Sequence, residues 1–524
     1  MAEQRITINS IFGGQSPSFH FSEDDQFLSS IAIDPDVPAS DTSTDIKTAG
    51  IIRPVGYSEF SSSALDQAPL WITTTPKDSK VWVYCAGGDI VSYNSSLASE
   101  ALERAVGSSG GNGFAYYNNY IYYATNTNIG RYGPLSATPA FDDDAWTTSP
   151  LGSQTALTDT TYPSSRHSTE YPNHPMHHHL SDNKLYVGDV VNGQGVLHAI
   201  KTTKTTDEGD TNDGSAFNVL DLPFGYAPFA IESYGLAVVV GASQVNTDTV
   251  LRHGQSALFF WDTTSPSFSR VVPLPDPFIT ALKYNNGVLY GWSGTLQGGV
   301  RFWQYVGGDT IQTIKYIEEG HPPMQGAVDA IGNRIAWGAF TTYPTNSASV
   351  FAYGSKSDLF PRGLHNIARS TVTATASNGL VTALKNVQQA DYAFPRFIIG
   401  ATDGTNINLD AKGTAYQTSV WRSRVYNIGR NFTVRGIHMR FPIAPSSNMT
   451  IVPKLFFDNE STSATGTTIN STNYTKKYLT LGAANFGNAV SGANNFFIEL
   501  TFSGTALLPV LLPIEIELDV DQNE

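Results

Sequence analysis

The segment Leu236-Ala237-Val238-Val239-Val240-Gly241 is an apolar run that ends on glycine, and a second apolar run, Ala257-Leu258-Phe259-Phe260-Trp261, follows it. This pairing of runs recurs along the chain, and seven first halves end on a small residue: Ala86, Ala124, Gly188, Gly241, Gly291, Gly338 and Gly400. A unit of this size cannot bury both faces of its own sheet. Repeated units must therefore share a core, and radial stacking does so with few open edges.

The spacing of the repeat predicts the fold. Successive small residues lie 38 to 64 residues apart, a range centred near the length of a four-stranded propeller blade. Helical patterning is nearly absent, and residues 96–106 are its one convincing candidate. We therefore predict an all-β chain whose residues 61–412 form an irregular β-propeller of about seven blades.

The two ends of the chain do not share the repeat. Residues 1–60 contain segments such as Asp34-Pro35-Asp36-Val37-Pro38, and we expect an extended N-terminal arm that leads into the first blade. Residues 413–524 contain runs that alternate with period two, which predicts a separate C-terminal antiparallel β-sandwich. The sequence leaves open whether the arm or the strand near Ile398 completes the first blade.

The composition narrows the class of protein. Hydrophobic residues make up 40% of the chain, which is enough for packed cores, but charged residues make up only 15%. The formal net charge of −15 argues against a protein that wraps a nucleic-acid backbone, because such proteins cluster Lys and Arg. A hydroxyl- and amide-rich surface of this kind is expected of a β-protein built for assembly or exposure.

The cysteine content and the apolar tracts also indicate which classes of protein the sequence excludes. Cys85 is the only cysteine and lies in an apolar strand pattern, so we expect it to be buried and exclude a disulfide scaffold. The first residues lack the basic and apolar regions of a signal peptide, so we expect no secretory route. Residues 507–513, the most apolar tract, are too short to span a bilayer.

Two clusters raise the question of a metal ion. Five histidines lie within thirteen positions: His167, His174, His177, His178 and His179. Three consecutive histidines on a strand point to alternate sides, which suits a polar strand better than tetrahedral zinc, although an ion stays an alternative. The acidic sets at 142–144 and 207–213 lack the alternating spacing of a calcium loop. We predict no metal and no cofactor.

Catalytic candidates are few. Asp189, Asp262 and Asp403 lie near strand ends, where a propeller enzyme can carry acids, but turn residues that cap backbone amides lie there too. A glycosidase needs two carboxylates that face each other, and no recurrent strand acid provides them. We predict no catalytic residues and no enzyme activity.

Basic residues gather near the C-terminus. Five arginines fall within nineteen residues: Arg422, Arg424, Arg430, Arg435 and Arg440. One interpretation is the polar outer face of a sheet. The other is a docking surface for an acidic partner subunit, for which Arg422, Arg424, Arg435 and Arg440 are the candidates.

Three segments carry a resemblance to a known family. These are Gly50-Ile51-Ile52-Arg53-Pro54, the paired echoes His174-Pro175-Met176 and His321-Pro322-Pro323-Met324, and residues 419–441, which begin the C-terminal region with Trp421-Arg422-Ser423-Arg424. Together with the arm–propeller–sandwich order, they resemble virion proteins of tailed bacteriophages, particularly propeller-containing nozzle or tail-hub proteins of short-tailed phages.

The resemblance implies a structural role in the virion tail, with assembly in the host cytoplasm. Expected partners are other copies in a ring, the adaptor, portal and fibre proteins, and viral DNA in transient contact, with no membrane span. The alternative is an adhesin or decoration protein that binds host-surface glycans by stacking on Tyr116, Tyr117, Tyr120, Tyr122 or Tyr123. A glycan-cleaving propeller enzyme is the third and least favoured reading.

Overall fold

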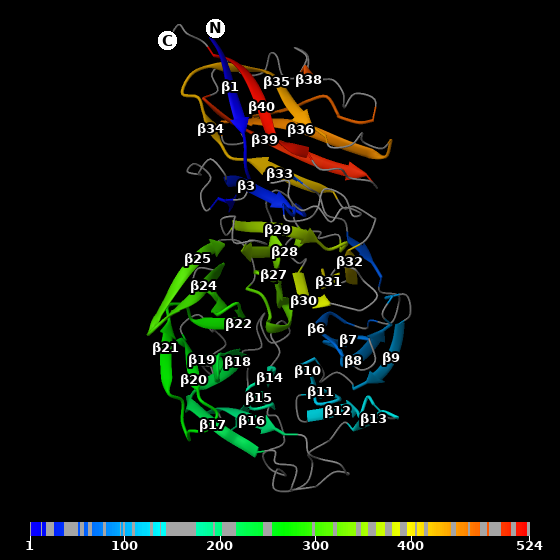
Figure 1. Cartoon of the computed structure of the whole chain (residues 1–524), viewed down its shortest axis with the longest axis vertical. Helices are drawn as coiled ribbons and strands as arrows, with labels where there is room; N and C mark the ends of the chain where they lie inside the picture. Colours follow the sequence, from blue (N-terminus) through cyan, green and yellow to red (C-terminus); the bar gives the residue numbers. More distant parts are fainter. Residues whose placement is uncertain are drawn as a thin grey trace.

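The described part of the chain consists almost entirely of β-strands and their connections (Figure 1). The computed structural model describes the chain apart from residues 1, 12, 17–25, 36–50, 53–56, 61–64, 66, 77–79, 95, 98–99, 107–110, 126–128, 137, 143–173, 192–193, 202–215, 245–253, 296–298, 318–321, 342–346, 355–362, 373–379, 388–395, 404–405, 413–417, 442–446, 459–461, 472–478, 481–493, 505–509 and 521–524. Within the described residues, no helix has the length and apolar character needed to cross a membrane.

Among the described residues, seven four-stranded antiparallel sheets form a β-propeller, so the predicted propeller and its count of about seven blades are confirmed. Blades one to three are β6 (Pro69–Thr74), β7 (Val81–Cys85), β8 (Asp89–Tyr93) and β9 (Glu100–Ala105); β10 (Gly113–Tyr117), β11 (Tyr120–Ala124), β12 (Ile129–Gly133) and β13 (Ala140–Asp142); and β14 (Met176–His179), β15 (Lys184–Val191), β16 (Gln194–Ile200) and β17 (Ala216–Phe224). Blades four and five are β18 (Tyr226–Tyr234), β19 (Ala237–Gln244), β20 (Ser256–Trp261) and β21 (Arg270–Leu274); and β22 (Phe278–Asn285), β23 (Val288–Gly294), β24 (Val300–Gly307) and β25 (Thr310–Ile317).

Blade six is β26 (Val328–Ile331), β27 (Arg334–Thr341), β28 (Ser347–Gly354) and β29 (Gly363–Arg369), preceded by the 3-10 turn η2 (Gln325–Ala327). Blade seven is β30 (Leu380–Val387), β31 (Arg396–Thr402) and β32 (Ile407–Lys412), with β5 (Tyr57–Glu59) as its outermost strand. The first strand of each blade contacts the first strand of the next, and β30 contacts β6. These seven inner strands therefore surround the propeller axis as a closed ring (Figure 1).

The seam between blades seven and one is buried. One hydrophobic cluster joins Val387, Ile398 and Leu409 of blade seven to Val83 and Cys85 of blade one. Cys85 is completely buried in it, as predicted from its apolar setting. The seam is thus held by the same apolar packing that holds neighbouring blades elsewhere.

The N-terminal residues complete the last blade rather than the first. Tyr57, Ser58 and Glu59 pair with Lys412, Ala411 and Asp410 of β32. The first blade draws all its strands from residues 69–105. This answers the question that the sequence left open, and it ties the two ends of the propeller together.

Two further sheets share one core at the end of the molecule next to β29 (Figure 1). We call them the two-sheet unit. One sheet contains β1 (Ala2–Ile8), β40 (Val510–Val520), β35 (Phe432–Arg440), β38 (Leu479–Thr480) and β4 (Ile51–Ile52). The other contains β2 (Gly14–Gln15), β3 (Gln26–Ile31), β33 (Ser419–Ser423), β39 (Asn495–Gly504), β36 (Met449–Phe457), β37 (Thr462–Thr465) and β34 (Tyr426–Asn427).

The boundaries predicted for the ends of the chain are wrong in one respect. Strands from residues 1–60 are integral to both sheets, since β1 pairs with β40 and β3 pairs with β33. Ile8 and Phe27 lie in the same core as Trp421, Phe496 and Ile516. The extended arm is therefore part of the unit assigned to residues 413–524, because its apolar side chains find their partners there.

The predicted helix at 96–106 is also wrong. Glu100–Ala105 forms β9, the outermost strand of blade one, and pairs with β8. Its side chains are mostly exposed, with Leu102 53% exposed. Pairing with an existing sheet edge supplies the backbone hydrogen bonds, and this tertiary contact outweighs local helical preference.

A buried ion pair fastens the N-terminal segment to the propeller. Arg334 of β27 donates to both carboxylate oxygens of Asp34, at 2.8 and 3.1 Å, and both side chains are less than a tenth exposed. Beside it, the amides of Ala32 and Ile33 donate to Asn366 of β29. Gly14 has φ +75°, and a Cβ there would lie 2.4 Å from the amide nitrogen of Leu364, so this approach requires glycine.

We expect Arg334→Met to lower the free energy of unfolding by about 3–5 kcal/mol, because it leaves the Asp34 carboxylate buried without its charged partner. Arg440 offers the matched control: its pair with Glu515 is 3.5 Å long and the two side chains are 63% and 23% exposed, so Arg440→Met should cost about 1 kcal/mol or less. Urea unfolding of both variants measures the difference. Equal costs would contradict the role assigned to the buried pair.

Candidate functional site

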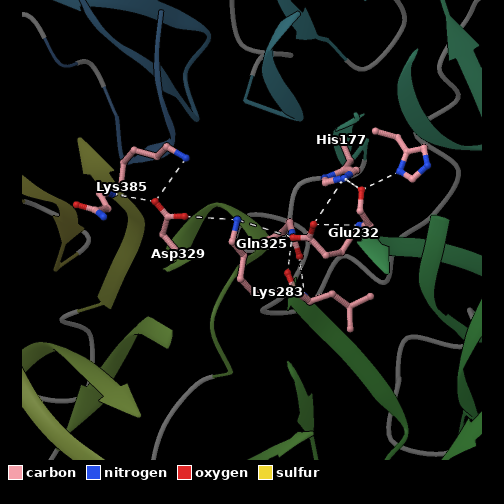
Figure 2. Close-up of polar contacts among 10 residues, drawn as sticks. His177, Glu232, Lys283, Gln325, Asp329 and Lys385 are labelled. Atoms are coloured by element: carbon pink, nitrogen blue, oxygen red, sulfur yellow. Dashed lines mark hydrogen bonds and ion pairs between the residues drawn. The ribbon is translucent and has the colours of Figure 1, made fainter. Parts of the chain in front are cut away.

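Polar side chains from five consecutive blades join at the propeller axis (Figure 2). They belong to inner strands: His177 to β14, Glu232 to β18, Lys283 to β22, Asp329 to β26 and Lys385 to β30. We call these five residues the axial arc. Each lies within three residues of the end of its strand, so the arc sits near the propeller face that carries the first turn of each blade.

Their positions in the repeat are equivalent. In blades three, four, six and seven, the arc residue pairs with the residue two positions before the small residue of the repeat: Tyr186, Val239, Ala336 and Ile398. In blade five it pairs with Tyr290, directly before Gly291. The repeat thus places one titratable side chain from each of these five blades at a similar level of the ring.

Opposite charges alternate along the arc. The Lys283 ammonium lies 3.8 Å from Glu232 and 3.4 Å from Asp329. The second oxygen of Asp329 lies 3.4 Å from the Lys385 ammonium and accepts a hydrogen bond of 2.9 Å from the Asn386 amide. Gln325 in η2 holds blades five and six together by bonding both the amide and the carbonyl of Leu282.

The pKa values follow from burial and from these neighbours. Burial opposes the charge on Lys283, but Glu232 and Asp329 together raise its pKa above the ordinary value. Burial likewise opposes ionisation of Asp329, but Lys385, Lys283 and two backbone amides outweigh it and lower the pKa. Lys283 and Asp329 are therefore both charged at neutral pH.

At one end, the arc continues into a hydrogen-bonded group. The Ser233 hydroxyl lies 2.7 Å from His177 Nε2 and 2.8 Å from His179 Nδ1. A hydroxyl has a single proton to donate, so at least one of the two imidazoles must donate to it. Glu232 lies 3.6 Å from His177 Nε2, which favours a proton on that nitrogen.

Burial lowers the pKa of His177 below 6.5, an effect only partly offset by Glu232. The unfolded chain therefore binds a proton more readily than the folded chain as the pH falls below 6.5.

The sequence contains a signal for this site that the sequence analysis did not identify. A proline or a small residue precedes each arc residue near the start of its strand. The number of residues between the two varies from blade to blade. Bulges at Phe229, Thr280 and Thr382 shift the register of three inner strands, so a search for recurrent acids at fixed spacing fails. Acidic and basic residues also alternate at this inner-strand position from blade to blade. A search for acidic residues alone therefore does not find the position.

The histidine cluster has no metal-binding arrangement among the residues that the structure describes; His167 lies outside them. His178 bonds Asn183 at 3.0 Å. His174 and His198 both approach the buried Asp189, whose oxygens lie 3.6 and 3.1 Å from their ring nitrogens. The amide of Asn218 donates to His198 Nδ1, which places the His198 proton on Nε2, toward Asp189.

The carboxylates weighed as catalytic candidates have structural partners. Asp262 accepts hydrogen bonds from the Ser265 hydroxyl and from the amides of Ser265 and Thr264, and these bonds lower its pKa. Asp403 accepts hydrogen bonds from the amide and the side chain of Asn406. Both therefore act as turn caps. Asp142 lies 3.4 Å from Arg131, whereas residues 143–144 and 207–213 lie outside the described part of the chain.

The arginines proposed for docking divide into two groups. Arg422 is buried, bonds Glu499 at 2.7 Å and packs over the rings of Phe456 and Phe497, so its assignment to a docking surface is wrong. Arg424 lies over the ring of Tyr426. Arg435 and Arg440 are 53% and 63% exposed but contact Asp519 and Glu515 of β40. A docking role for Arg424, Arg435 and Arg440 stays a prediction.

The tyrosines considered for glycan stacking are mostly in the core. Tyr117, Tyr122 and Tyr123 are buried, whereas Tyr116 and Tyr120 keep part of their surface. A buried ring cannot stack on a ligand, so three of the five candidates fall away.

Comparisons with known proteins add little. No family model matches the chain, and no curated protein matches it. Among solved structures, the computationally designed Ika8 protein is 14% identical, covers 68% of this chain and 99% of its own, and has a TM-score of 0.36. The β-propeller domain of Cps50 (Swd1) from Myceliophteria thermophila is 10% identical with the same coverage and a TM-score of 0.38. Both TM-scores are low, so the chain's own seven sheets carry the fold assignment.

The lowered pKa of His177 predicts a pH dependence of stability. Because the unfolded state binds more protons below pH 6.5, the free energy of unfolding should fall as the pH drops below that value. His177→Gln should flatten this dependence, because it removes the imidazole whose pKa is lowered by burial. Urea unfolding at a series of pH values measures it. An unchanged slope in His177→Gln would refute the assignment.

Proposed function

We propose that the chain is a structural subunit of a tailed-phage virion, a tail hub or nozzle protein that assembles into a ring lining or closing the DNA exit channel. Its partners would be further copies of itself and the adjoining tail proteins. The proposal starts from the family resemblance of residues 50–54, 174–176, 321–324 and 419–441 and gains support from how the two parts of the molecule are joined.

The observation that supports it best is the course of the N-terminal segment. It contributes β1 and β3 to the two-sheet unit, bonds blade six through Asp34, returns to β40 through β4 and ends as β5 in blade seven. Separating the two parts would break the buried Asp34–Arg334 ion pair and the hydrogen bonds of the Ala32 and Ile33 amides to Asn366. Such a joint suits a ring subunit that must keep its shape while the genome passes.

Arg435 and Arg440 give the proposal a local test. They lie exposed on the outer face of the sheet that contains β1, β40 and β35, where they could exchange a carboxylate of β40 for one on a neighbouring subunit. We expect the double variant Arg435→Gln, Arg440→Gln to lose ring assembly in mass photometry, with Arg5→Gln on the same face as the matched control. Equal assembly by both variants would remove these arginines from the interface.

The function itself is tested by cryo-EM of the particle that carries the chain. The proposal expects a closed ring of these subunits around the tail axis. Propellers that hang at the periphery and face solvent would replace it with the adhesin or decoration role. Absence of the chain from the particle would overturn both.

A further inference from the structure

The axial arc presents its charges to solvent unequally. The side chains of Lys385, Lys283 and His177 are 32%, 25% and 19% exposed, whereas Glu232 and Asp329 are only 8% and 9% exposed. The basic side chains of the arc are therefore more accessible to solvent than the carboxylates between them. A ligand that reaches the arc from solvent meets the basic side chains before the carboxylates.

The arc leaves hydrogen-bonding capacity unused. Its three ammonium–carboxylate separations are 3.4, 3.4 and 3.8 Å, whereas a direct charge-assisted hydrogen bond is about 2.7–2.9 Å long. Each ammonium has three donors, and separations of this length are typical of groups that a third polar group can bridge. The lysine ammonium groups therefore lie near the carboxylates without a short, direct hydrogen bond to them.

The alternation of charge selects the class of ligand. The arc carries two basic and two acidic side chains. The lysines attract an anion but the neighbouring carboxylates repel it, and a cation is attracted by the carboxylates and repelled by the lysines. A hydroxyl group avoids this conflict because it accepts from an ammonium and donates to a carboxylate at once. A row of hydroxyl groups matches a row of alternating donors and acceptors.

We propose that the axial arc is a binding site for a neutral saccharide, with ring hydroxyls bridging Lys385 to Asp329 and Lys283 to Glu232. His177 lies at the end of the arc, where its imidazole bounds the site. This site is distinct from the tyrosines of blade two and does not rest on the structural role proposed above. The saccharide proposal is compatible with a ring subunit and with a peripheral adhesin.

The test uses the full-length chain and a panel of neutral disaccharides (maltose, cellobiose and lactose), with sodium phosphate and glycine as charged comparators. Saturation-transfer NMR detects binding, and calorimetry gives the affinity. We expect at least one disaccharide to bind saturably. Lys385→Gln should weaken it about tenfold or more, because a hydrogen bond to a charged group is lost.

Lys80→Gln is the matched control, since Lys80 is 36% exposed and also pairs with a glutamate. Lys80 directly precedes β7, and its partner Glu103 lies on β9, the outermost strand of blade one. The affinity of the Lys80→Gln variant for the disaccharide should equal that of the unaltered chain. Thermal unfolding establishes that each variant is folded; if Lys385→Gln is not, Lys283→Gln takes its place. No binding by any disaccharide, binding of phosphate or glycine alone, or equal affinity in the arc and control variants would each overturn the proposal.

Discussion

Closure of the propeller ring is the constraint on which the rest of this structure depends. Seven inner strands must meet around one axis, and the seam between blades seven and one has no covalent continuity of its own. Apolar side chains of both blades bury it, with Val83 and Cys85 against Ile398 and Leu409. The strand β5 then adds residues from the beginning of the chain to the last blade. Opening the seam would therefore expose apolar surface and break a strand ladder together.

The same N-terminal segment couples the propeller to the two-sheet unit. It passes through both sheets before it reaches blade seven, and Asp34 meets Arg334 in a buried bidentate pair on the way. A buried pair of this kind contributes less to net stability than to fixing one arrangement, because removal of either partner leaves an uncompensated charge. The segment thus makes the placement of the two parts a consequence of folding.

A closed ring also gives the axial arc its chemistry. Side chains from five blades reach one another only because their inner strands are neighbours around the axis. Their mutual contacts keep Asp329 and Lys283 ionised against the cost of burial, while the partly exposed lysine side chains keep donors for a ligand. The arc therefore combines a structural role between blades with an accessible polar surface, and the saccharide proposal concerns only the latter.

The sequence by itself determined the all-β class, the seven repeats and the burial of Cys85, because these follow from local patterns of apolar and small residues that each blade repeats. Only the tertiary structure decided which residues meet. It paired residues 57–59 with β32, turned residues 100–105 into an edge strand, and buried Arg422 against Glu499. It also brought His177 to Ser233 and Lys283 to Asp329. Strand pairing joins residues hundreds of positions apart, and bulges shift the register that a local pattern would need, so no repeat period encodes these contacts.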